Sequence, residues 1–297
     1  MMRKEDTMGY VIVTDSVLDI EESYLLQNDI CTVPLSFTLE GCDTVEDDFG
    51  RTVPFSSFYQ QLREGKSITT SQATVGAFAS VFEGILQSCR DVVYIGFSSA
   101  LSGSFQSGCM ARDELKDRYP NRVYCVDTFA ASGGQTLIVR EAAKRRAEGM
   151  TAEQLVEWVE EFRTHVVHWF TVDDLMYLHR GGRVSKSSAV MGSLVGIKPI
   201  LYVSDDGRLI ADKKVRGRRR ALDMLCKQLN AHIRNIGSYP VTISHGDCLE
   251  DAEYLKNYIL SHTEVKDVEI HMLDTVIGAH AGPGTVALFF YGDKRGN

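Results

Sequence analysis

The stretch SSALSGSFQSG, residues 98–108, directly follows the apolar run VVYIGF at residues 92–97. A short apolar run rich in β-branched and aromatic residues predicts a buried strand, and the small hydroxyl residues with glycine after it predict a turn that enters a helix. We therefore expect a strand, a turn and then a helix over residues 104–117. Serine hydroxyls and free backbone N–H groups at such a turn either cap the helix or bind an anionic oxygen.

The same alternation continues on both sides of this turn. Further strands are expected at residues 10–16, within CTVPLSFTLEG (31–41) and at 122–127, and further helices at 74–88 and 134–148. Alternating strands and helices favour the α/β class, with a mostly parallel sheet flanked by helices.

The second half of the chain has a different pattern. HWFTVDDL predicts a strand that enters a helix, and Asp206-Gly207 is a strong turn signal for a β-hairpin. Helices at 218–236 and 249–261 alternate with strands that end in the apolar run GTVALFFYG. We expect an α+β domain with a mixed or antiparallel sheet over 161–297, after an N-terminal α/β domain over 9–160.

Composition narrows the class of function. The formal net charge of −8 over 297 residues argues against broad binding to nucleic acid. Seven cysteines, an odd number without a CxxC pair, favour reduced thiols and a cytoplasmic protein. The chain has neither an apolar run of membrane-spanning length nor a signal-peptide pattern at its start. The spacing of the histidines predicts no metal site.

Two other segments carry candidate site residues. TTSQAT, residues 69–74, places hydroxyl groups before an apolar helix. His280 lies in the segment GAHAGPG, whose glycines predict a bend between two apolar strands. Capping explains the hydroxyls as well as ligand binding does, and a structural hydrogen bond is the alternative for the histidine. Ser102 and His280 also leave open a serine-dependent hydrolase or a small-molecule transferase, although no G-x-S-x-G, P-loop or dinucleotide motif is present. A regulatory protein that binds another ligand is a third alternative.

Basic residues gather in two places. LHRGGRVSKSS contains Arg180, Arg183 and Lys186, and KKVRGRRRA covers residues 213–221. Both are interpreted either as a solvated surface or as a face for an acidic partner or a phosphate.

Taken in order, these motifs resemble those of the DegV family, bacterial fatty-acid-binding proteins that serve a fatty acid kinase. The motifs are VIVTDS, TTSQAT, GFSSALSGSFQSG, VDTFAASGG, LHRGGRVSKSSAVMGSLVGIKPIL, DDGRL and GAHAGPGTVALFF, between residues 10 and 291. Ala73 departs from the family's usual proline, and Ser104-Phe105 from its frequent Thr-Tyr pair.

The resemblance implies a two-domain protein with a long-chain fatty acid in a tunnel between the domains. It implies that Thr70, Ser102 and His280 hold the carboxylate, with Ser71, Ser98 and Gly103 as secondary positions. A partner kinase would convert the bound acid to an acyl phosphate for phospholipid synthesis, and Arg183 and Arg216 would be its docking residues. The chain itself would be a carrier with no catalytic residue and no cofactor, in transient contact with a membrane surface.

Overall fold

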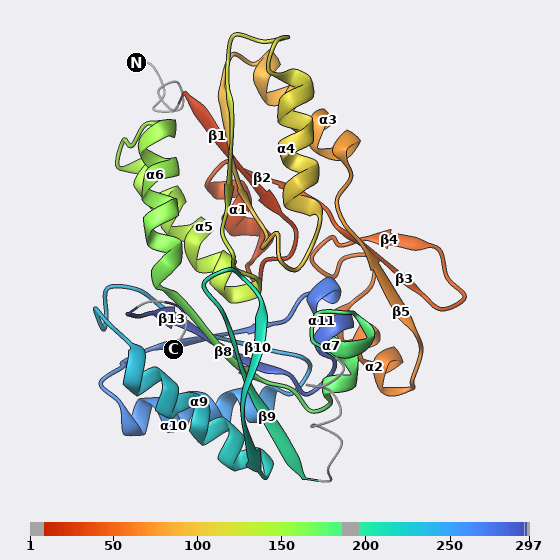
Figure 1. Ribbon diagram of the computed structural model, residues 1–297, viewed down its shortest axis with the longest axis vertical. Coiled ribbons are helices and arrows are strands. Elements are labelled where there is room, and N and C mark those ends of the chain that lie inside the picture. The colour runs from red at the N-terminus through yellow and green to blue at the C-terminus, as the bar shows by residue number, and fades with distance from the viewer. Residues whose placement is uncertain (1–8, 186–195, 294, 296–297) are drawn as a thin grey trace.

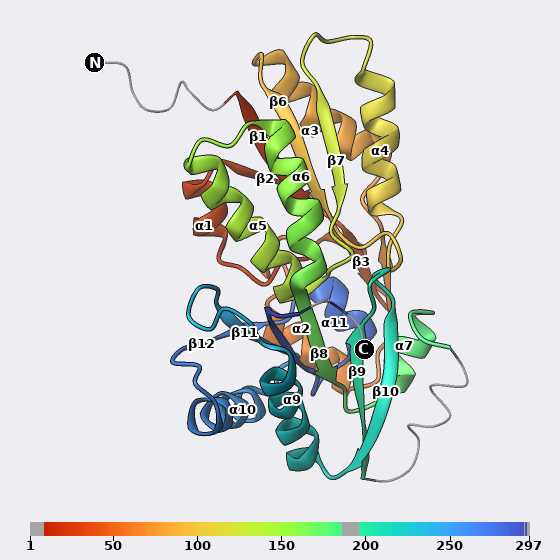
Figure 2. The same ribbon diagram turned by 60° about the vertical axis from the view of Figure 1, so that its left-hand side comes forward.

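The computed structural model describes residues 9–185, 196–293 and 295. Within them, a four-stranded sheet in the order β2-β1-β6-β7 forms the upper part of the molecule in Figures 1 and 2. All of its neighbouring strands are parallel. Its strands are β1 (Tyr10–Asp15), β2 (Ile30–Val33), β6 (Asp91–Gly96) and β7 (Val123–Asp127).

Helices cover both faces of this parallel sheet. Ile12 and Val93 pack toward one face, and their neighbours Val13 and Tyr94 pack toward the other, so each strand is buried on both sides. The helices are α1 (Glu22–Gln27), α3 (Val75–Gln87), α4 (Ser104–Leu115), α5 (Ser132–Ala147) and α6 (Ala152–Phe162). The α/β prediction is confirmed, including the turn between β6 and α4.

A six-stranded mixed sheet forms the lower part, in the order β10-β9-β8-β13-β11-β12. All of its pairs are antiparallel except β11 with β12. The strands are β8 (Val166–Thr171), β9 (Ile197–Val203), β10 (Leu209–Arg216), β11 (Val241–His245), β12 (Val268–Met272) and β13 (Val286–Tyr291). Helices α9 (Arg218–His232) and α10 (Leu249–His262) pack on one of its faces. Helix α9 is shorter than expected, because Ile233 leaves the helix in an extended conformation.

A small antiparallel sheet in the order β4-β3-β5 was not expected in the N-terminal half. The single strand predicted for CTVPLSFTLEG is wrong: Pro34 follows the last residue of β2, and β3 begins two residues later in another sheet. Proline lacks the N–H that a continuing ladder needs, so the chain changes sheets there. The strands are β3 (Ser36–Leu39), β4 (Thr44–Glu46) and β5 (Ile68–Ser71).

Three short helices lie beside this small sheet: α2 (Phe55–Arg63), α7 (Leu175–Arg180) and α11 (Thr275–Ala281). Phe37 and Phe58 form an edge-to-face pair beneath α11, with ring centroids 5.4 Å apart. The glycine-rich segment around His280 was predicted as a bend between two strands. That prediction is wrong, because Asp274 caps a helix there by accepting a hydrogen bond from the Ile277 N–H at 2.8 Å.

Candidate functional site

A cavity of about 1020 Å³, its open mouth included, is lined by residues of the small sheet and of the six-stranded sheet, together with the segments that follow β2 and β6 of the parallel sheet. Most of its wall is apolar, with Leu35 and Phe97 from the N-terminal half and Phe170, Val276 and Phe289 from the C-terminal half. The two halves of the chain therefore enclose one largely apolar space.

Hydrogen bonds between the end of β5 and the first turn of α4 bring two predicted segments together. The Ala73 N–H donates to Ser104 Oγ at 3.2 Å, and Gln72 Nε2 donates to Ser107 Oγ at 2.9 Å. A Cβ on Gly103 would lie 2.0 Å from Gln72 Oε1, so a larger residue there would displace the Gln72 amide from its present position. The contact places TTSQAT and LSGS on the same cavity wall.

Thr70, Ser71, Ser102 and Gly103 all line the cavity as a result. The Ser102 hydroxyl lies 3.0 Å from Ser104 Oγ and also accepts a hydrogen bond from the Ser104 N–H at 3.2 Å. Thr70 is half-buried and Ser71 is exposed, so this part of the wall faces the mouth of the cavity.

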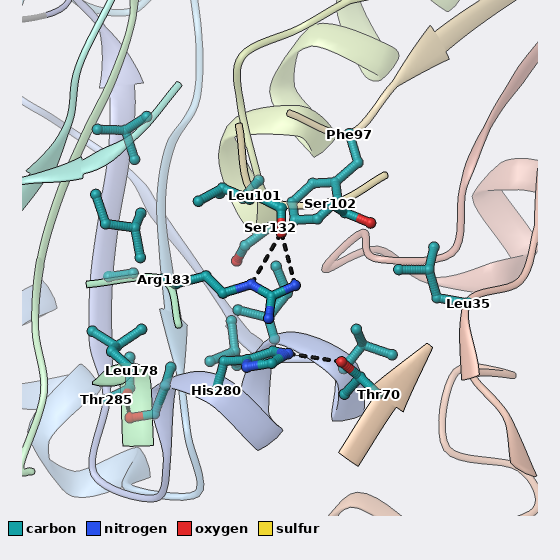
Figure 3. A pocket seen from close by; sticks show the side chains of 18 of the residues that line it. Leu35, Thr70, Phe97, Leu101, Ser102, Ser132, Leu178, Arg183, His280 and Thr285 are labelled. Carbon is teal, nitrogen blue, oxygen red and sulfur yellow. Dashed lines mark hydrogen bonds between the residues drawn. The ribbon is translucent and has the colours of Figure 1, made fainter. Parts of the chain in front are cut away.

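His280 reaches the same place from the last turn of α11. Its Nε2 lies 2.7 Å from Thr70 Oγ1, the contact drawn in Figure 3. Burial, together with the positive charge of Arg183, lowers the pKa of His280 to about 4, so the imidazole is neutral at pH 7. When Nε2 carries the ring proton, the ring donates to Thr70 and leaves the Thr70 hydroxyl hydrogen for a ligand.

Arg183 lies directly beside His280 in Figure 3 and completes the polar side of the cavity. Its Nε and Nη2 donate to the Leu101 carbonyl at 3.0 and 2.9 Å, and its Nη1 donates to the Gly181 carbonyl. Burial lowers the pKa of this guanidinium. A Cβ on Gly181 would lie 2.1 Å from His280 Nδ1, which explains the first glycine of the Gly181-Gly182-Arg183 segment.

The electrostatics of this wall favour an anion. Hydroxyl, amide, imidazole and guanidinium groups face the cavity, and within the described residues no aspartate or glutamate lines it. Because the remaining wall is apolar, the cavity suits an amphiphile with one anionic end. Among the described residues no group of three or more histidine, cysteine, aspartate or glutamate side chains is placed so that it could hold a metal ion.

The geometry does not assemble the nucleophile and base of a serine hydrolase. Ser102 and His280 share the cavity, but the hydrogen bonds of Ser102 go to Ser104 and that of His280 goes to Thr70. Nucleophilic catalysis by serine requires the base to bond to the nucleophile.

Two other predicted positions, Ser98 and Arg216, lie away from this wall. Ser98 is fully buried and donates to the Gly207 carbonyl at 3.1 Å, and it does not line the cavity. Arg216 is exposed at the end of β10, paired with Ile197, and also lies outside the lining. Lys186 falls outside the described residues.

Sequence reasoning missed two contributions to the site. Gln72 was passed over although it belongs to the TSQ motif, whose glutamine fixes the wall through Ser107. The apolar lining from β8, β10 and β13 was also missed, because these residues look like ordinary core in the sequence. Only the tertiary structure distinguishes apolar residues that line the cavity from apolar residues that are packed against one another in the core.

Comparison with known proteins gives consistent results. A family model described as "Uncharacterised protein, DegV family" matches residues 10–293. A DegV domain-containing protein of Clostridium perfringens is 40% identical over 287 residues, which are 96% of this chain and 98% of the relative. Another, from Caldanaerobacter subterraneus, is 33% identical over 279 residues, 94% of this chain and 97% of the relative.

Solved structures agree with this match. A DegV family protein from Thermus thermophilus, described by its fatty acid binding, superposes with a TM-score of 0.86 at 30% identity over 96% of this chain and 100% of that one. DegV from Bacillus subtilis, described as a fatty acid binding protein, superposes with a TM-score of 0.79 at 26% identity, with 97% and 100% coverage. The match along almost the whole sequence and the shared fold show that this chain belongs to the DegV family.

Proposed function

We propose that this protein binds a long-chain fatty acid in the cavity between its two halves and presents the carboxylate to a separate fatty acid kinase. One observation carries the proposal: an apolar cavity of about 1020 Å³ ends in a cluster of hydrogen-bond donors without a carboxylate among the described lining residues. The relatives described as fatty acid binding proteins support the same ligand.

The proposed carboxylate site consists of Thr70, Ser102 and His280, with Ser71 and Gly103 beside them. A carboxylate buried without partners carries a large desolvation cost, which the hydroxyl groups of Thr70 and Ser102 offset, with the neutral imidazole of His280 orienting the Thr70 hydroxyl toward the ligand. Arg183 adds a positive charge next to the head group, so the ligand charge is balanced within the cavity.

The acyl chain supplies the affinity. Each buried methylene contributes about 0.8 kcal/mol, so roughly 14 of them contribute about 11 kcal/mol before the cost of association is subtracted. The two proposed domains, 9–160 and 161–297, would both contact the ligand, since lining residues come from both ranges.

The proposed partner reaction takes place at the head group. An oxygen of the fatty acid carboxylate attacks the terminal phosphorus of a nucleoside triphosphate held by the kinase. The new O–P bond replaces the bond to the nucleoside diphosphate, which leaves, and the acyl phosphate then enters phospholipid synthesis. In this scheme the protein contributes binding and presentation, and the kinase contributes the catalysis.

Native mass spectrometry of the purified chain tests the ligand. We expect copurified long-chain fatty acids in wild type and their loss in Thr70→Val/Ser102→Ala, with the circular dichroism spectrum unchanged. A wild-type chain that carries no lipid and fails to bind added palmitate contradicts the proposal.

The docking proposal is tested separately. Arg216 is exposed and lies outside the cavity lining, so Arg216→Ala is expected to retain palmitate binding and to reduce turnover by the cognate kinase. Lys227→Ala, at an exposed position farther along α9, is the matched control. Loss of palmitate binding in Arg216→Ala would contradict a docking role. Arg183 lies in the cavity wall, so we expect Arg183→Ala to affect both binding and turnover.

A further inference from the structure

Three aspartates meet where α11 joins the rest of the molecule. Asp19, Asp47 and Asp274 are each only 2% exposed, although they come from distant parts of the chain. In the described part of the protein none of them forms an ion pair with a lysine or arginine. Buried carboxylates without a cationic partner are uncommon, because burial favours the uncharged acid.

Asp19 connects the two halves of the chain. Its Oδ2 accepts hydrogen bonds from the hydroxyl of Ser132 on α5 and from that of Ser244 on β11, the latter at 2.6 Å. Its Oδ1 accepts from the Asp274 N–H at 3.2 Å. The segment between β1 and α1 is thus attached to the residue that caps α11.

Asp47 and Asp274 hold the first turn of α11 itself. Asp47 accepts hydrogen bonds from the hydroxyls of Ser16 and Thr275, each at 2.8 Å. Asp274 Oδ1 accepts from the Ile277 N–H at 2.8 Å, whereas its Oδ2 is buried without a hydrogen-bond partner. An ionised oxygen in that position would lack compensation, so the geometry favours a proton on Asp274.

The carboxyl groups also act on one another. Burial raises the pKa of Asp47 to about 6 and raises that of Asp19, and burial with the charges of Asp47 and Asp19 raises the pKa of Asp274 well above its usual range. Carboxyl groups with raised values in the folded state stabilise it fully below about pH 4, and this stabilisation is lost as the pH rises through about 6 and above.

Other titratable groups face the cluster from the surrounding elements. Asp48 adjoins Asp47 and raises its pKa, His271 on β12 lowers that of Asp19, and Tyr59 on α2 donates its hydroxyl hydrogen to the Leu273 carbonyl. Asp15, at the end of β1, is also buried and has a pKa raised to about 6, but it accepts hydrogen bonds from Tyr94 and the Phe97 N–H on another side. Asp15 is therefore the group whose titration must be separated from that of the cluster.

Helix α11 links the cluster to the ligand cavity. It carries Val276, Ile277 and His280, all of which line the cavity, and Thr275 and Asp274 at its start belong to the cluster. A change in the hydrogen bonds that hold the first turn of α11 therefore affects the position of the residues of α11 that line the cavity.

We propose that Asp19, Asp47 and Asp274 form a proton-sharing anchor for α11, so that deprotonation of the anchor loosens the helix and weakens fatty acid binding. Asp274 is a positioning residue in this scheme, since it acts on the ligand through α11. The link to affinity rests on the proposed fatty acid binding, whereas the link to stability does not.

The experiment measures the affinity of the delipidated full-length chain for cis-parinaric acid, a fluorescent fatty acid, between about pH 6 and about pH 8.5 at constant ionic strength. The monomeric acid is ionised throughout this range, because ordinary carboxyl groups titrate near pH 4. We expect the wild-type affinity to fall about threefold or more with rising pH, and the affinity of Asp274→Asn to change less than about 1.5-fold. Asparagine keeps the helix cap and cannot ionise.

Two further variants identify the group responsible. Asp48→Asn removes a neighbouring charge outside the anchor and is expected to keep the wild-type slope. Asp15→Asn is also expected to keep it. The proposal would be overturned if the affinity of Asp15→Asn for cis-parinaric acid did not change with pH while that of Asp274→Asn fell as in wild type. It would also be overturned if the wild-type affinity did not change with pH.

The melting temperature of the ligand-free chain over the same pH range is an independent measurement. Wild type is expected to lose stability as the pH rises, and Asp274→Asn to lose less. If Asp274→Asn does not fold, Asp47→Asn replaces it with the same expectation. A chain that binds no cis-parinaric acid at any pH would count against the proposed function, while parallel melting profiles of wild type and variant would overturn the anchor.

Discussion

The polar and the apolar parts of the cavity wall are built in different ways. The polar part comes from four short segments at the ends of elements, which carry Thr70, Ser102, Arg183 and His280, and hydrogen bonds hold these segments together. The apolar part comes from the strands and helices themselves, such as Phe289 on β13 and Val276 on α11, and packing holds it in place. The first fixes the position of a charged group, and the second sets how much hydrocarbon surface can be buried.

The difference implies different sensitivities. Removing one donor leaves the other donors in place, so the cost is that of a single hydrogen bond to a charged group. Filling the apolar space excludes the ligand itself. Substitutions in the two parts of the wall therefore measure the two contributions separately.

The largest effect is expected from Ala287→Trp. Ala287 lines the cavity on β13, and an indole there occupies the space of several methylenes of the ligand. We expect the palmitate affinity to fall by about 300-fold or more. Ala231→Trp, at an exposed position near the end of α9, is the control and should bind normally in the same calorimetric titration. Normal binding by Ala287→Trp would mean that the ligand lies elsewhere.

Thr70→Val tests the polar part with a substitution of nearly equal shape. Loss of one hydrogen bond to a carboxylate, together with the Thr70–His280 contact, should weaken palmitate binding about 10- to 100-fold. Thr69→Val changes the preceding residue, which is exposed and lies outside this cavity lining, and should have little effect. Equal losses in both variants would show that β5 is disturbed generally.

A smaller effect is expected from Gly181→Ala, which acts through His280. The new methyl group would lie 2.1 Å from Nδ1, so the imidazole must move away from Thr70. We expect a loss of about fivefold in palmitate affinity, less than the loss of a donor because the ring can adjust. Gly84→Ala, within α3 and with no atom within 4 Å of the added Cβ, is the control.

The last prediction concerns protonation, with no substitution. Because the pKa of His280 is lowered to about 4, its imidazole signals in a heteronuclear NMR titration should stay those of a neutral ring down to about pH 5. The contribution of His280 to stability is lost as the pH falls from about 6.5 to about 4, since the unfolded chain binds a proton there that the folded imidazole does not, while the buried aspartates act in the opposite direction over the same range. A titration midpoint above pH 6 would show that His280 is solvated.

Much of this architecture follows from local sequence. VVYIGF and the serine-rich turn predicted β6 and α4, and the Asp206-Gly207 turn predicted the β9–β10 hairpin, because period and turn chemistry are local properties. The predicted residues Thr70, Ser102 and His280 do line one cavity. Which of these residues contact a ligand, and which only cap a helix, stays a prediction.

What the sequence did not reveal depends on tertiary contacts. Helix α11 was predicted as a bend because three glycines masked a helix of seven residues that Asp274 caps and the small sheet covers. Arg183 was interpreted only as a docking residue, because nothing in GGR indicates that the guanidinium reaches the Leu101 carbonyl, 82 residues away in sequence. The buried anchor of α11 was missed for the same reason, as its three aspartates are separated by up to 255 residues.

The departure at Ala73 has a local explanation. Proline at this position would lack the N–H that Ala73 donates to Ser104 Oγ, so this chain fastens β5 to α4 with a hydrogen bond at that point.

The contact between Ser98 and Gly207 has a consequence for the integrity of the molecule. The tip of the β9–β10 hairpin belongs to the C-terminal half, yet it is seated so closely on the N-terminal half that a Cβ on Gly207 would lie 2.3 Å from Ser98 Oγ. The small sheet likewise reaches from the N-terminal half to α11. The halves are interlocked at two places, so a chain cleaved between α6 and β8 should remain a single noncovalent complex, and either fragment expressed alone should aggregate.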